Sequence, residues 1–509
     1  MNIDAFLSGF TSATEPQNLL YCLIGVLIGM LIGVLPGLGP AATMAILLPI
    51  VVTVDPVSGI IMMAGIYYGA QYGGTITSVL LQLPGEASSV VTVFDGFALA
   101  KQGKAGAALG VAAIGSFVGA TISIVGLTLL APLVASWALD FGPPEYAALA
   151  LLGVLLVATI GSGNTVKAMI AAATGLLFAT VGRDSFTNTG RFTFDSLELA
   201  EGLDFVVVAM GLFGVAEILY NLEERHGKVH VPVKVGKVWP TRRDLRQSSG
   251  AIGRGSVIGF FLGVLPGGGA VMASLAAYAT EKRISKNPER FGRGALEGVA
   301  APESANNAAA TSSFIPLLTL GIPANASMGM LFAALLVLGV TPGPQLVEEN
   351  PELFWGVINS MYIGNLLLLL LSIPLVGIFI RVLRVRPAIL APIICVITII
   401  GVYTINNSTF DIFVMILFGI VGYLMKKTGF EPGPMVLAFV LGAILEDSVR
   451  RSLLIFGGDP TQFFTRPISG TILACFLLVV LLPVIQAVRH RRTAPTTTAD
   501  QPDRKDSLR

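Results

Sequence analysis

The sequence contains few charged residues and few of the side chains that usually carry out catalysis. Only 12% of its 509 residues are Asp, Glu, Lys or Arg, against about 25% in an average soluble protein. The three histidines, His226, His230 and His490, lie in polar stretches, and neither an HExxH nor a G-x-x-x-x-G-K-[ST] motif occurs. We therefore expect no enzyme, no resident cofactor or metal and, at a net charge of +1, no nucleic-acid partner.

Cysteine is equally scarce, and the N-terminus lacks basic residues. Cys22, Cys395 and Cys475 all lie in apolar stretches with a spacing that fits no disulfide framework or metal site. Residues 1–17 contain no Lys or Arg, whereas a secretory signal peptide begins with a positively charged region. We expect buried cysteines and no cleaved signal.

Hydrophobic residues, in contrast, make up 54% of the chain and recur in long runs. Runs of about 18 or more apolar residues indicate membrane-spanning helices, so the sequence predicts an all-α polytopic membrane protein with about 10–12 membrane segments. A basic polar stretch at 221–250 interrupts the runs and is predicted to be a cytoplasmic loop. The polar tail at 490–509 is predicted to be disordered and cytoplasmic.

Two similar segments divide the chain into halves, 1–220 and 251–489. GVLPGLGPAA occupies residues 33–42, and GVLPGGGAVM occupies residues 263–272. Each is followed by a stretch dotted with polar residues, at 67–89 and 302–327, that ends in Leu83-Pro84 or Ile322-Pro323. Two halves with matched broken helices are typical of secondary transporters.

The charges of the loops indicate that the two halves are inverted relative to one another. Residues 53–58 contain no Lys or Arg, whereas the matching loop 281–293 contains five; further along, 95–106 contains two lysines and 341–352 none. Because cytoplasmic loops are enriched in Lys and Arg, we predict a hairpin at 18–54 that enters from outside and one at 251–280 that enters from the cytoplasm. The N-terminus is then periplasmic and the C-terminus cytoplasmic. Arg450 and Arg451 fall outside, against the rule, and leave the topology of 430–468 open.

Broken helices at membrane depth require a reason, because unpaired backbone is tolerated only inside protein or beside a wet cavity. Pro36 and Pro266 stop the helix that precedes them. The following helix begins with free N–H groups that suit a carboxylate, and the preceding one ends in carbonyls that suit sodium. The alternative is that these residues are packing glycines or kinks.

The stretch Pro302-Glu303-Ser304-Ala305-Asn306-Asn307 groups one carboxylate, one hydroxyl and two amides. Such side chains are costly in hydrocarbon and should face a cavity. Asn306 and Asn307 could donate to a substrate carboxylate. Glu303 would repel an anion, which leaves cation binding, protonation or capping of a helix just outside the membrane. Glu86 is expected to lie in a loop.

Six ordered blocks together resemble one transporter family. They are PGLGPAATMAILLPI, YYGAQYGGTITSVLLQLPGE, DGFALAKQGKAG, GVLPGGGAVMAS, PESANNAAATSSFIPLLTLGIP and GVTPGPQL. Over roughly residues 15–460 the sequence is similar to the large membrane permease subunit of tripartite tricarboxylate transporters, the TctA family. One departure is Ala324, where a Gly is expected after the Pro.

The resemblance implies secondary active import of carboxylates such as citrate across the bacterial inner membrane, usually as cation symport. It also implies a periplasmic solute-binding protein and a small four-helix membrane subunit as partners. A homo-oligomer is left open. The residues predicted to bind substrate are Gly37, Gly39, Thr43, Gly73, Gly74, Thr75, Gly267, Gly268, Gly269, Ser304, Asn306 and Asn307. Those predicted to bind the cation are Pro36, Gly37, Pro266, Gly267, Glu303 and Asn307.

Several alternatives remain at this stage. A carboxylate carrier that works without a binding protein would look the same, and an anion channel also uses re-entrant loops. Sodium is favoured over the proton as coupling ion, and alternating access is expected to be elevator-like rather than rocking. The sequence does not name the carboxylate.

Overall fold

The computed structural model describes residues 3–35, 39–51, 53–82, 84–160, 164–223, 238–382 and 387–493. Almost all of these residues with regular structure are helical. The two strands in the described part are β1 (Gly182–Arg183) and β2 (Gly190–Arg191), which form one short antiparallel hairpin. The all-α class expected from the apolar runs is confirmed.

The first half, up to the basic stretch, contains the following helices: α1 (Ile3–Ala13), α2 (Pro16–Gly33), α3 (Pro40–Val51), α4 (Pro56–Leu81), η1 (Ala87–Ser89), α5 (Val90–Lys101), α6 (Ala105–Ala138), α7 (Pro143–Ile160), α8 (Thr165–Phe178), α9 (Leu197–Ala200), α10 (Phe205–Ala209), η2 (Met210–Val215) and α11 (Ala216–Glu223).

The second half contains α12 (Arg242–Val264), α13 (Gly269–Ile284), η3 (Pro288–Arg290), α14 (Glu297–Ser312), α15 (Phe314–Leu320), α16 (Ala326–Val337), α17 (Leu346–Glu349), α18 (Pro351–Ser372), α19 (Val376–Val382), α20 (Pro387–Asn406), α21 (Thr409–Lys427), α22 (Pro432–Ile455), α23 (Gln462–Thr465) and α24 (Pro467–Thr493).

Helices α2 and α3 form a hairpin against α4. Gly25, Gly29 and Gly33 of α2 lie in turn against the backbone of Met62, Ile66 and Ala70 of α4. Residue numbers rise together along this contact, so α2 and α4 run parallel and α3 must return the chain between them. The start of α2 therefore lies beside the start of α4, where Ser58 Oγ donates to Asn18 Oδ1 at 2.6 Å.

Helices α12 and α13 repeat this arrangement against α14. Gly255, Gly259 and Gly263 of α12 lie in turn against the backbone of Ala301, Ala305 and Ala309. The small residues allow the two backbones to approach closely, which is a common mode of helix packing in membranes. Both predicted hairpins therefore have the shape expected from their Pro-Gly tips.

The start of the second hairpin differs from the prediction. Helix α12 begins at Arg242 rather than at residue 251, because Thr241 and Asp244 form a capping box that starts the helix within the basic stretch. The added turns carry most of the charge of α12, and Arg254 pairs with Glu281 of α13 at 2.5 Å. Only the later part of α12 is apolar.

Helices α4 and α14 lie side by side in opposite directions. Thr75 of α4 contacts Glu303 of α14, and Tyr67, further back on α4, packs on Phe314, just beyond the end of α14. Because α4 and α14 each run parallel to the first limb of their own hairpin, the two hairpins also point in opposite directions.

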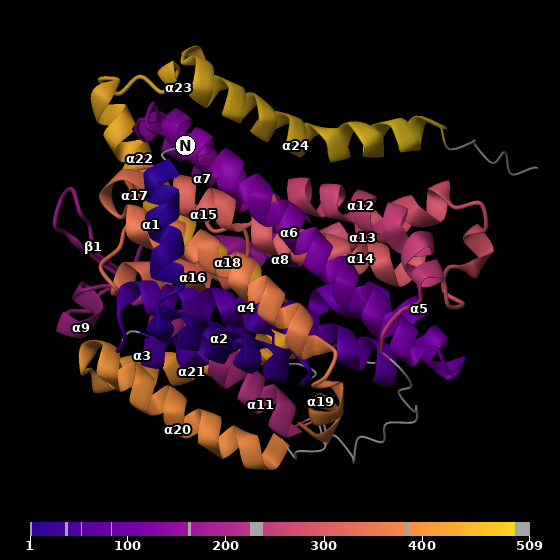
Figure 1. Ribbon diagram of the computed structural model, residues 1–509. Coiled ribbons are helices and arrows are strands. Elements are labelled where there is room, and N and C mark those ends of the chain that lie inside the picture. Colours follow the sequence, from indigo (N-terminus) through magenta and orange to yellow (C-terminus); the bar gives the residue numbers. More distant parts are fainter. Residues whose placement is uncertain are drawn as a thin grey trace, which may run out of the picture.

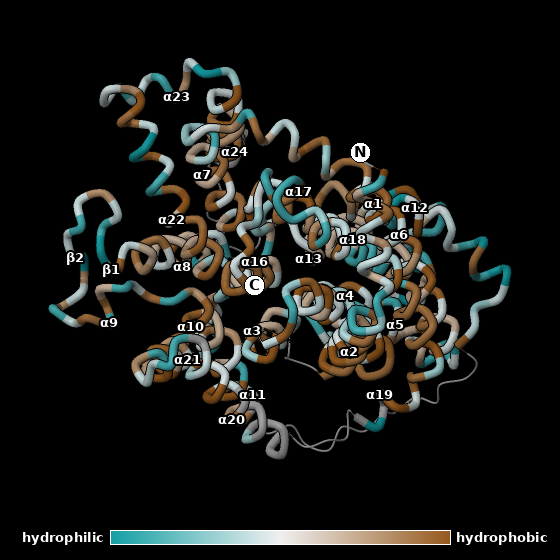
Figure 2. The backbone as a smooth tube through the Cα atoms, turned by 60° about the vertical axis from the view of Figure 1, so that its left-hand side comes forward, coloured by the Kyte–Doolittle hydropathy of each residue, from teal (hydrophilic) through white to brown (hydrophobic). Residues whose placement is uncertain are grey.

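Other helices surround this centre. Figure 1 shows α24 along one edge of the molecule, α20 and α21 along the opposite edge, and α4 and α18 between them. In Figure 2 the hydrophilic segments are concentrated at β1 and β2, α9, α17 and α23, whereas the helices between them are mostly hydrophobic. Apolar helices with polar ends are typical of a multi-pass membrane protein.

Five helices in the described residues are long and apolar enough to cross a membrane: Pro16–Gly33, Ala105–Ala138, Pro351–Ser372, Thr409–Lys427 and Pro432–Ile455. Six shorter apolar helices accompany them. This supports the polytopic membrane class. The total of 10–12 segments and the division at 220 and 251 stay predictions.

Candidate functional site

The end of α2 and the tip of the second hairpin each lie beside a break between later helices. In the first half, α4 ends at Leu81 and η1 begins at Ala87; Gly85, between them, packs on the carbonyl of Gly33. In the second half, α15 ends at Leu320 and α16 begins at Ala326. There the backbone N–H of Gly267 donates to the carbonyl of Ala324 at 2.9 Å. The helical backbone is therefore interrupted at two places inside the protein.

The second tip requires glycine for both its conformation and its packing. Gly267 has a φ of 79°, which favours glycine. A Cβ on Gly267 would lie 2.6 Å from the carbonyl oxygen of Leu156 on α7. The tip is therefore held between α7 and the break that contains Ala324.

Glu303 lies at the contact between α4, α5 and α14, with no exposed surface. Thr75 of α4 donates to Oε2 of Glu303 at 2.6 Å, and Thr92 of α5 donates to Oε1 at 2.5 Å. Its position within α14 rules out a cap outside the membrane. A buried carboxylate held by two hydroxyl groups can accept a proton or share its oxygens with a cation.

The amides of Asn306 and Asn307 are buried on the same helix. Asn307 Nδ2 donates to Ser116 Oγ of α6 at 2.8 Å and to the Asn306 Oδ1 at 2.5 Å. Asn306 lies close enough to interact with the Glu303 carboxylate, but its Nδ2 has no hydrogen-bonding partner of normal geometry, and neither has Asn307 Oδ1. Buried amide atoms without partners are unusual in folded proteins. The donor Asn306 Nδ2 and the acceptor Asn307 Oδ1 are two such atoms near Glu303.

Glu86 is a second buried acid, which the sequence placed in a loop. It forms a capping box with Ser89 at the start of η1 and is 9% exposed. With its amide nitrogen turned toward them, Gln71 donates to Glu86 Oε1 at 2.6 Å and to Ser88 Oγ at 2.8 Å. The sequence contains one signal for a role of Glu86 at the first break. When Pro84 is aligned with Pro323, Glu86 is paired with Asn325 of the second break.

Tyr67 connects the two breaks. Asn325 Nδ2 donates to the Tyr67 hydroxyl at 3.1 Å, and the Asn325 Oδ1 caps α16 by accepting from the Met328 backbone N–H. Glu86 lies close enough to Tyr67 and to Glu303 to interact electrostatically with both. The two breaks and Glu303 therefore belong to one polar region inside the protein.

The predicted substrate and cation residues are only partly brought together. Thr75 and Gly74 reach the polar region, where Gly74 packs on the Glu86 side chain. The Ser304 hydroxyl donates to Ala301 O and faces α12, which indicates a packing role. Thr43 donates to the carbonyl of Gly39 at the start of α3.

The remaining predicted residues lie away from the asparagines or outside the described part of the chain. Gly73 of α4 packs on Met30 and Gly33 near the end of α2. Pro266, Gly267, Gly268 and Gly269 form the second tip, beyond the level of Ala309, where Gly267 contacts Leu156 and Ala324. Pro36 and Gly37 lie outside the described residues.

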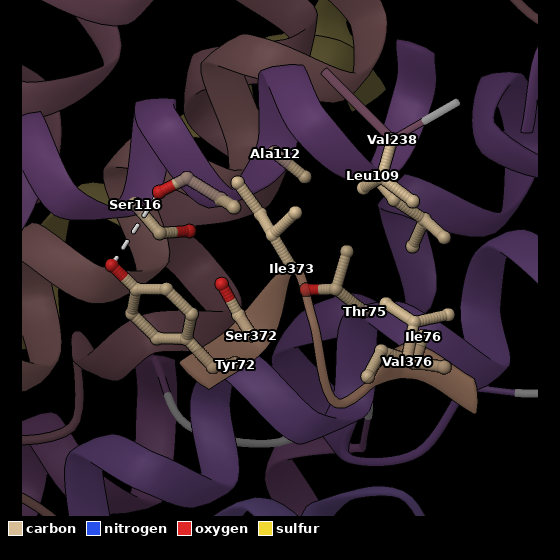
Figure 3. Close-up of a pocket in the computed structure, with 11 residues that line it drawn as sticks. Tyr72, Thr75, Ile76, Leu109, Ala112, Ser116, Val238, Ser372, Ile373 and Val376 are labelled. Atoms are coloured by element: carbon tan, nitrogen blue, oxygen red, sulfur yellow. Dashed lines mark hydrogen bonds between the residues drawn. The ribbon is translucent and has the colours of Figure 1, made fainter. Parts of the chain in front are cut away.

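A small crevice reaches the hydroxyl groups around Glu303. Figure 3 shows Ile373 lying between Ala112 of α6 and Thr75 of α4. The full lining is Tyr72, Thr75, Ile76, Leu109, Ala112, Ala113, Ser116, Val238, Ser372, Ile373 and Val376. Thr75 contacts Glu303 and Ser116 contacts Asn307, whereas Val238, Ser372, Ile373 and Val376 come from the end of the basic stretch and the α18–α19 junction.

Comparison with known proteins agrees with this architecture. A protein of Agrobacterium vitis described as "Uncharacterized 52.8 kDa protein in TAR-I ttuC' 3'region" is 49% identical over 95% of this chain and 96% of its own length. A second one, "Uncharacterized protein in TAR-II ttuC' 3'region", is 50% identical over 46% of this chain and 97% of its own length. No solved structure matches. The family model "Tripartite tricarboxylate transporter TctA family" matches residues 19–437, and the chain belongs to this family.

Proposed function

We propose that this protein is the large membrane subunit of a binding-protein-dependent secondary transporter that imports di- or tricarboxylates by symport with a cation. The observation that carries the proposal is the arrangement of two oppositely directed hairpins: the end of α2 in the first hairpin and the tip of the second each lie beside a break between later helices. Such paired broken helices supply free N–H groups and carbonyls at the middle of a membrane protein. We interpret the two halves as inverted repeats.

The second break supports binding of an anion. Helix α16 begins there with the neutral Asn325 as its cap, and α13 begins at the adjoining tip with Gly269. Helix N-termini favour negative charge. In the first half, the corresponding position holds Glu86, which already places a carboxylate at the start of η1. A substrate carboxylate therefore fits the second break better than the first.

The charges at the two ends of the molecule support an orientation. Lys167 at the start of α8 donates to Thr428 O, and Lys426 and Lys427 lie at the same end. By the positive-inside rule this end is cytoplasmic. The hairpin of β1 and β2, at the opposite end of α8, is then periplasmic and lies on the side from which a solute-binding protein would deliver substrate.

Alternating access follows from the same arrangement. The unit that contains α2–α5 and α12–α16 would move against the surrounding helices, which include α7, α8 and α22, and so expose the breaks to each side in turn. We favour an elevator-like movement in the bacterial inner membrane, with sodium as the coupling ion. Family membership further suggests a small membrane subunit and a periplasmic binding protein as partners.

Uptake into proteoliposomes tests the proposal. The chain is reconstituted with its small membrane partner, the binding protein is added outside, and labelled di- and tricarboxylates are screened with and without an inward sodium gradient. We expect accumulation that requires both the gradient and the binding protein. Accumulation without the binding protein would identify a stand-alone carrier, and flux that never exceeds equilibrium would identify a channel. A folded complex that moves no carboxylate under a sodium or proton gradient would refute the substrate class.

A further inference from the structure

Two buried carboxylates in the polar region have no positively charged partner among the described residues. Glu303 is fully buried and Glu86 nearly so, yet the ion pairs in the described part of the chain are formed by other acids, such as Asp184, Glu145 and Glu281. Buried carboxylates are normally paired or neutralised. Gly74 packs on the Glu86 side chain and the next residue, Thr75, donates to Glu303. Because the two carboxylates lie against neighbouring residues of α4, both can be ionised only if a positive charge comes from outside the described residues.

The surroundings of Glu303 suit a small cation. The hydroxyl oxygens of Thr75 on α4 and Thr92 on α5 lie 2.6 and 2.5 Å from its carboxylate. Asn307 Oδ1 is a buried acceptor without a partner on the same face of α14. Carboxylate, hydroxyl and amide oxygens are the ligands that transported sodium uses, and the same carboxylate can hold a proton.

The other titratable groups near Glu303 do not supply the positive charge that the two carboxylates require. Tyr72 of α4 and Glu86 are close enough to Glu303 to interact with it electrostatically. Asp95 of α5 is buried one turn beyond Thr92 and is occupied by the backbone N–H groups of the loop before α14 and by the Tyr278 hydroxyl. None of these groups is a base that carries positive charge.

The crevice gives this centre a connection to one side of the protein. Its lining includes Thr75, whose hydroxyl donates to the Glu303 carboxylate, Ser116, whose hydroxyl donates to the Glu303 backbone carbonyl, and Val238 at the end of the basic stretch. It has room for little more than a water-sized species. A monatomic cation or a proton carried by water fits this space, whereas a tricarboxylate does not.

We propose that Glu303 and Glu86 together bind the cation whose gradient drives transport, sodium or the proton, and that this crevice is the route between the centre and the cytoplasmic side. The inference rests on the proposed function and assigns its coupling site. It places the cation at the first break and beside Glu303, apart from the second break that we assign to the substrate.

Direct binding tests the centre without requiring transport. Radioactive sodium binding and proton uptake are measured on the purified complex for the wild type, Glu303→Gln, Glu86→Gln and the exposed control Glu349→Gln. We expect the wild type and the control to bind sodium or to take up a proton, and each of the other variants to bind about tenfold or more weakly, because a charged ligand is lost. A wild type that binds neither, or variants that bind like the wild type, would overturn the proposal.

Transport by the same proteins identifies the cation. If sodium is bound, Glu303→Gln raises the sodium concentration for half-maximal uptake about tenfold or more. If the proton is bound, the neutral glutamine mimics the loaded state, so exchange of labelled for unlabelled substrate persists while accumulation against a gradient is lost. Accumulation with unchanged cation dependence in both Glu variants would show that coupling occurs elsewhere, even though carboxylate transport stands.

Thr92→Val provides a variant for the case that Glu303→Gln does not fold. It removes one hydroxyl from the centre, keeps both acids, and should weaken cation affinity several-fold. A Thr92→Val protein that matches the wild type in cation affinity would contradict the ligand role.

Cysteine labelling tests the route. In a chain in which the three native cysteines are replaced, Ile373→Cys places a thiol in the crevice, and Leu370→Cys places one on the exposed face of the adjoining helix α18. The silver ion, a monatomic cation that reacts with thiols, should block uptake in Ile373→Cys and spare Leu370→Cys when it is added from the cytoplasmic side. Full uptake by completely labelled Ile373→Cys would exclude the crevice as the path.

Discussion

Replacement of Gly259 by Ala should destabilise the second hairpin, whereas replacement of Gly253 on the same helix should not. A methyl group at Gly259 of α12 would overlap the carbonyl oxygen of Ala305 on α14. Because this atom belongs to the backbone of a buried helix, it cannot rotate away. Gly259→Ala must therefore push α12 and α14 apart, which also increases the distance of Gly255 and Gly263 from the α14 backbone.

The size of the effect follows from two opposing contributions. Overpacking of a close contact costs about 1–3 kcal/mol, and replacement of Gly by Ala within a helix returns about 1 kcal/mol. Gly253 of the same helix gives the matched control, because an added Cβ there meets no atom within 4 Å. We expect Gly253→Ala to be neutral or stabilising, and Gly259→Ala to be less stable than Gly253→Ala by about 1–3 kcal/mol.

Thermal unfolding of the detergent-purified complex measures this difference. A change of about 1 kcal/mol shifts Tm by roughly 2–4 °C in domains of 150–250 residues, and a smaller shift is expected in this longer chain. Gly29→Ala, at the corresponding place in α2, should behave like Gly259→Ala because its Cβ would meet the carbonyl of Ile66 at the α4 backbone. Equal midpoints for Gly253→Ala and Gly259→Ala would refute the close approach of α12 and α14.

Two further predictions concern the end of the molecule that carries β1 and β2. The backbone N–H of Thr187, together with Arg450, holds the pKa of Asp184 well below its usual range. The ionised Asp184 should therefore stabilise the fold by a constant amount above the pKa of an unfolded Asp, about 4, and by less as the pH falls below that value. Asp184→Asn should remove this acid dependence in unfolding curves from pH 3 to 7. Arg466 pairs with Glu145 at 2.9 Å, and Glu145 is buried, so Arg466→Gln should lower stability, while the double variant with Glu145→Gln should recover part of it, as a double-mutant cycle would show.

The hairpins were predictable because their signal is local and occurs twice. Pro36 and Pro266 each interrupt an apolar run within the same five-residue motif, GVLPG. The charges of the loops that follow change sign between the two copies. Gly25, Gly29 and Gly33 recur as Gly255, Gly259 and Gly263, a repeat that is visible in the sequence once the copies are aligned. The start of α12 was missed because a capping box extends the helix into charged sequence, where hydropathy carries no signal.

The polar region was predicted only in part because its contacts join residues far apart in the chain. Glu303 was a candidate from its own stretch, but its partners Thr75 and Thr92 lie more than two hundred positions away. Glu86 lies in the loop between α4 and η1, as its position after Pro84-Gly85 predicted, but the folded chain buries this loop and places Glu86 against Gly74. Hydrogen-bonding partners at such separations follow from the packing of helices, which hydropathy does not specify.

Arg450 lies in the segment whose topology the loop charges leave open. In the proposed orientation it lies at the periplasmic end, where the positive-inside rule disfavours arginine. The structure pairs it with Asp184 at 2.5 Å, and Glu446 of the same helix pairs with Arg191 at 2.6 Å. The rule counts Lys and Arg in short loops, and nearby acids change it little, so the topology of 430–468 stays a prediction. The two pairs instead neutralise charged side chains that are partly buried at this end of α22.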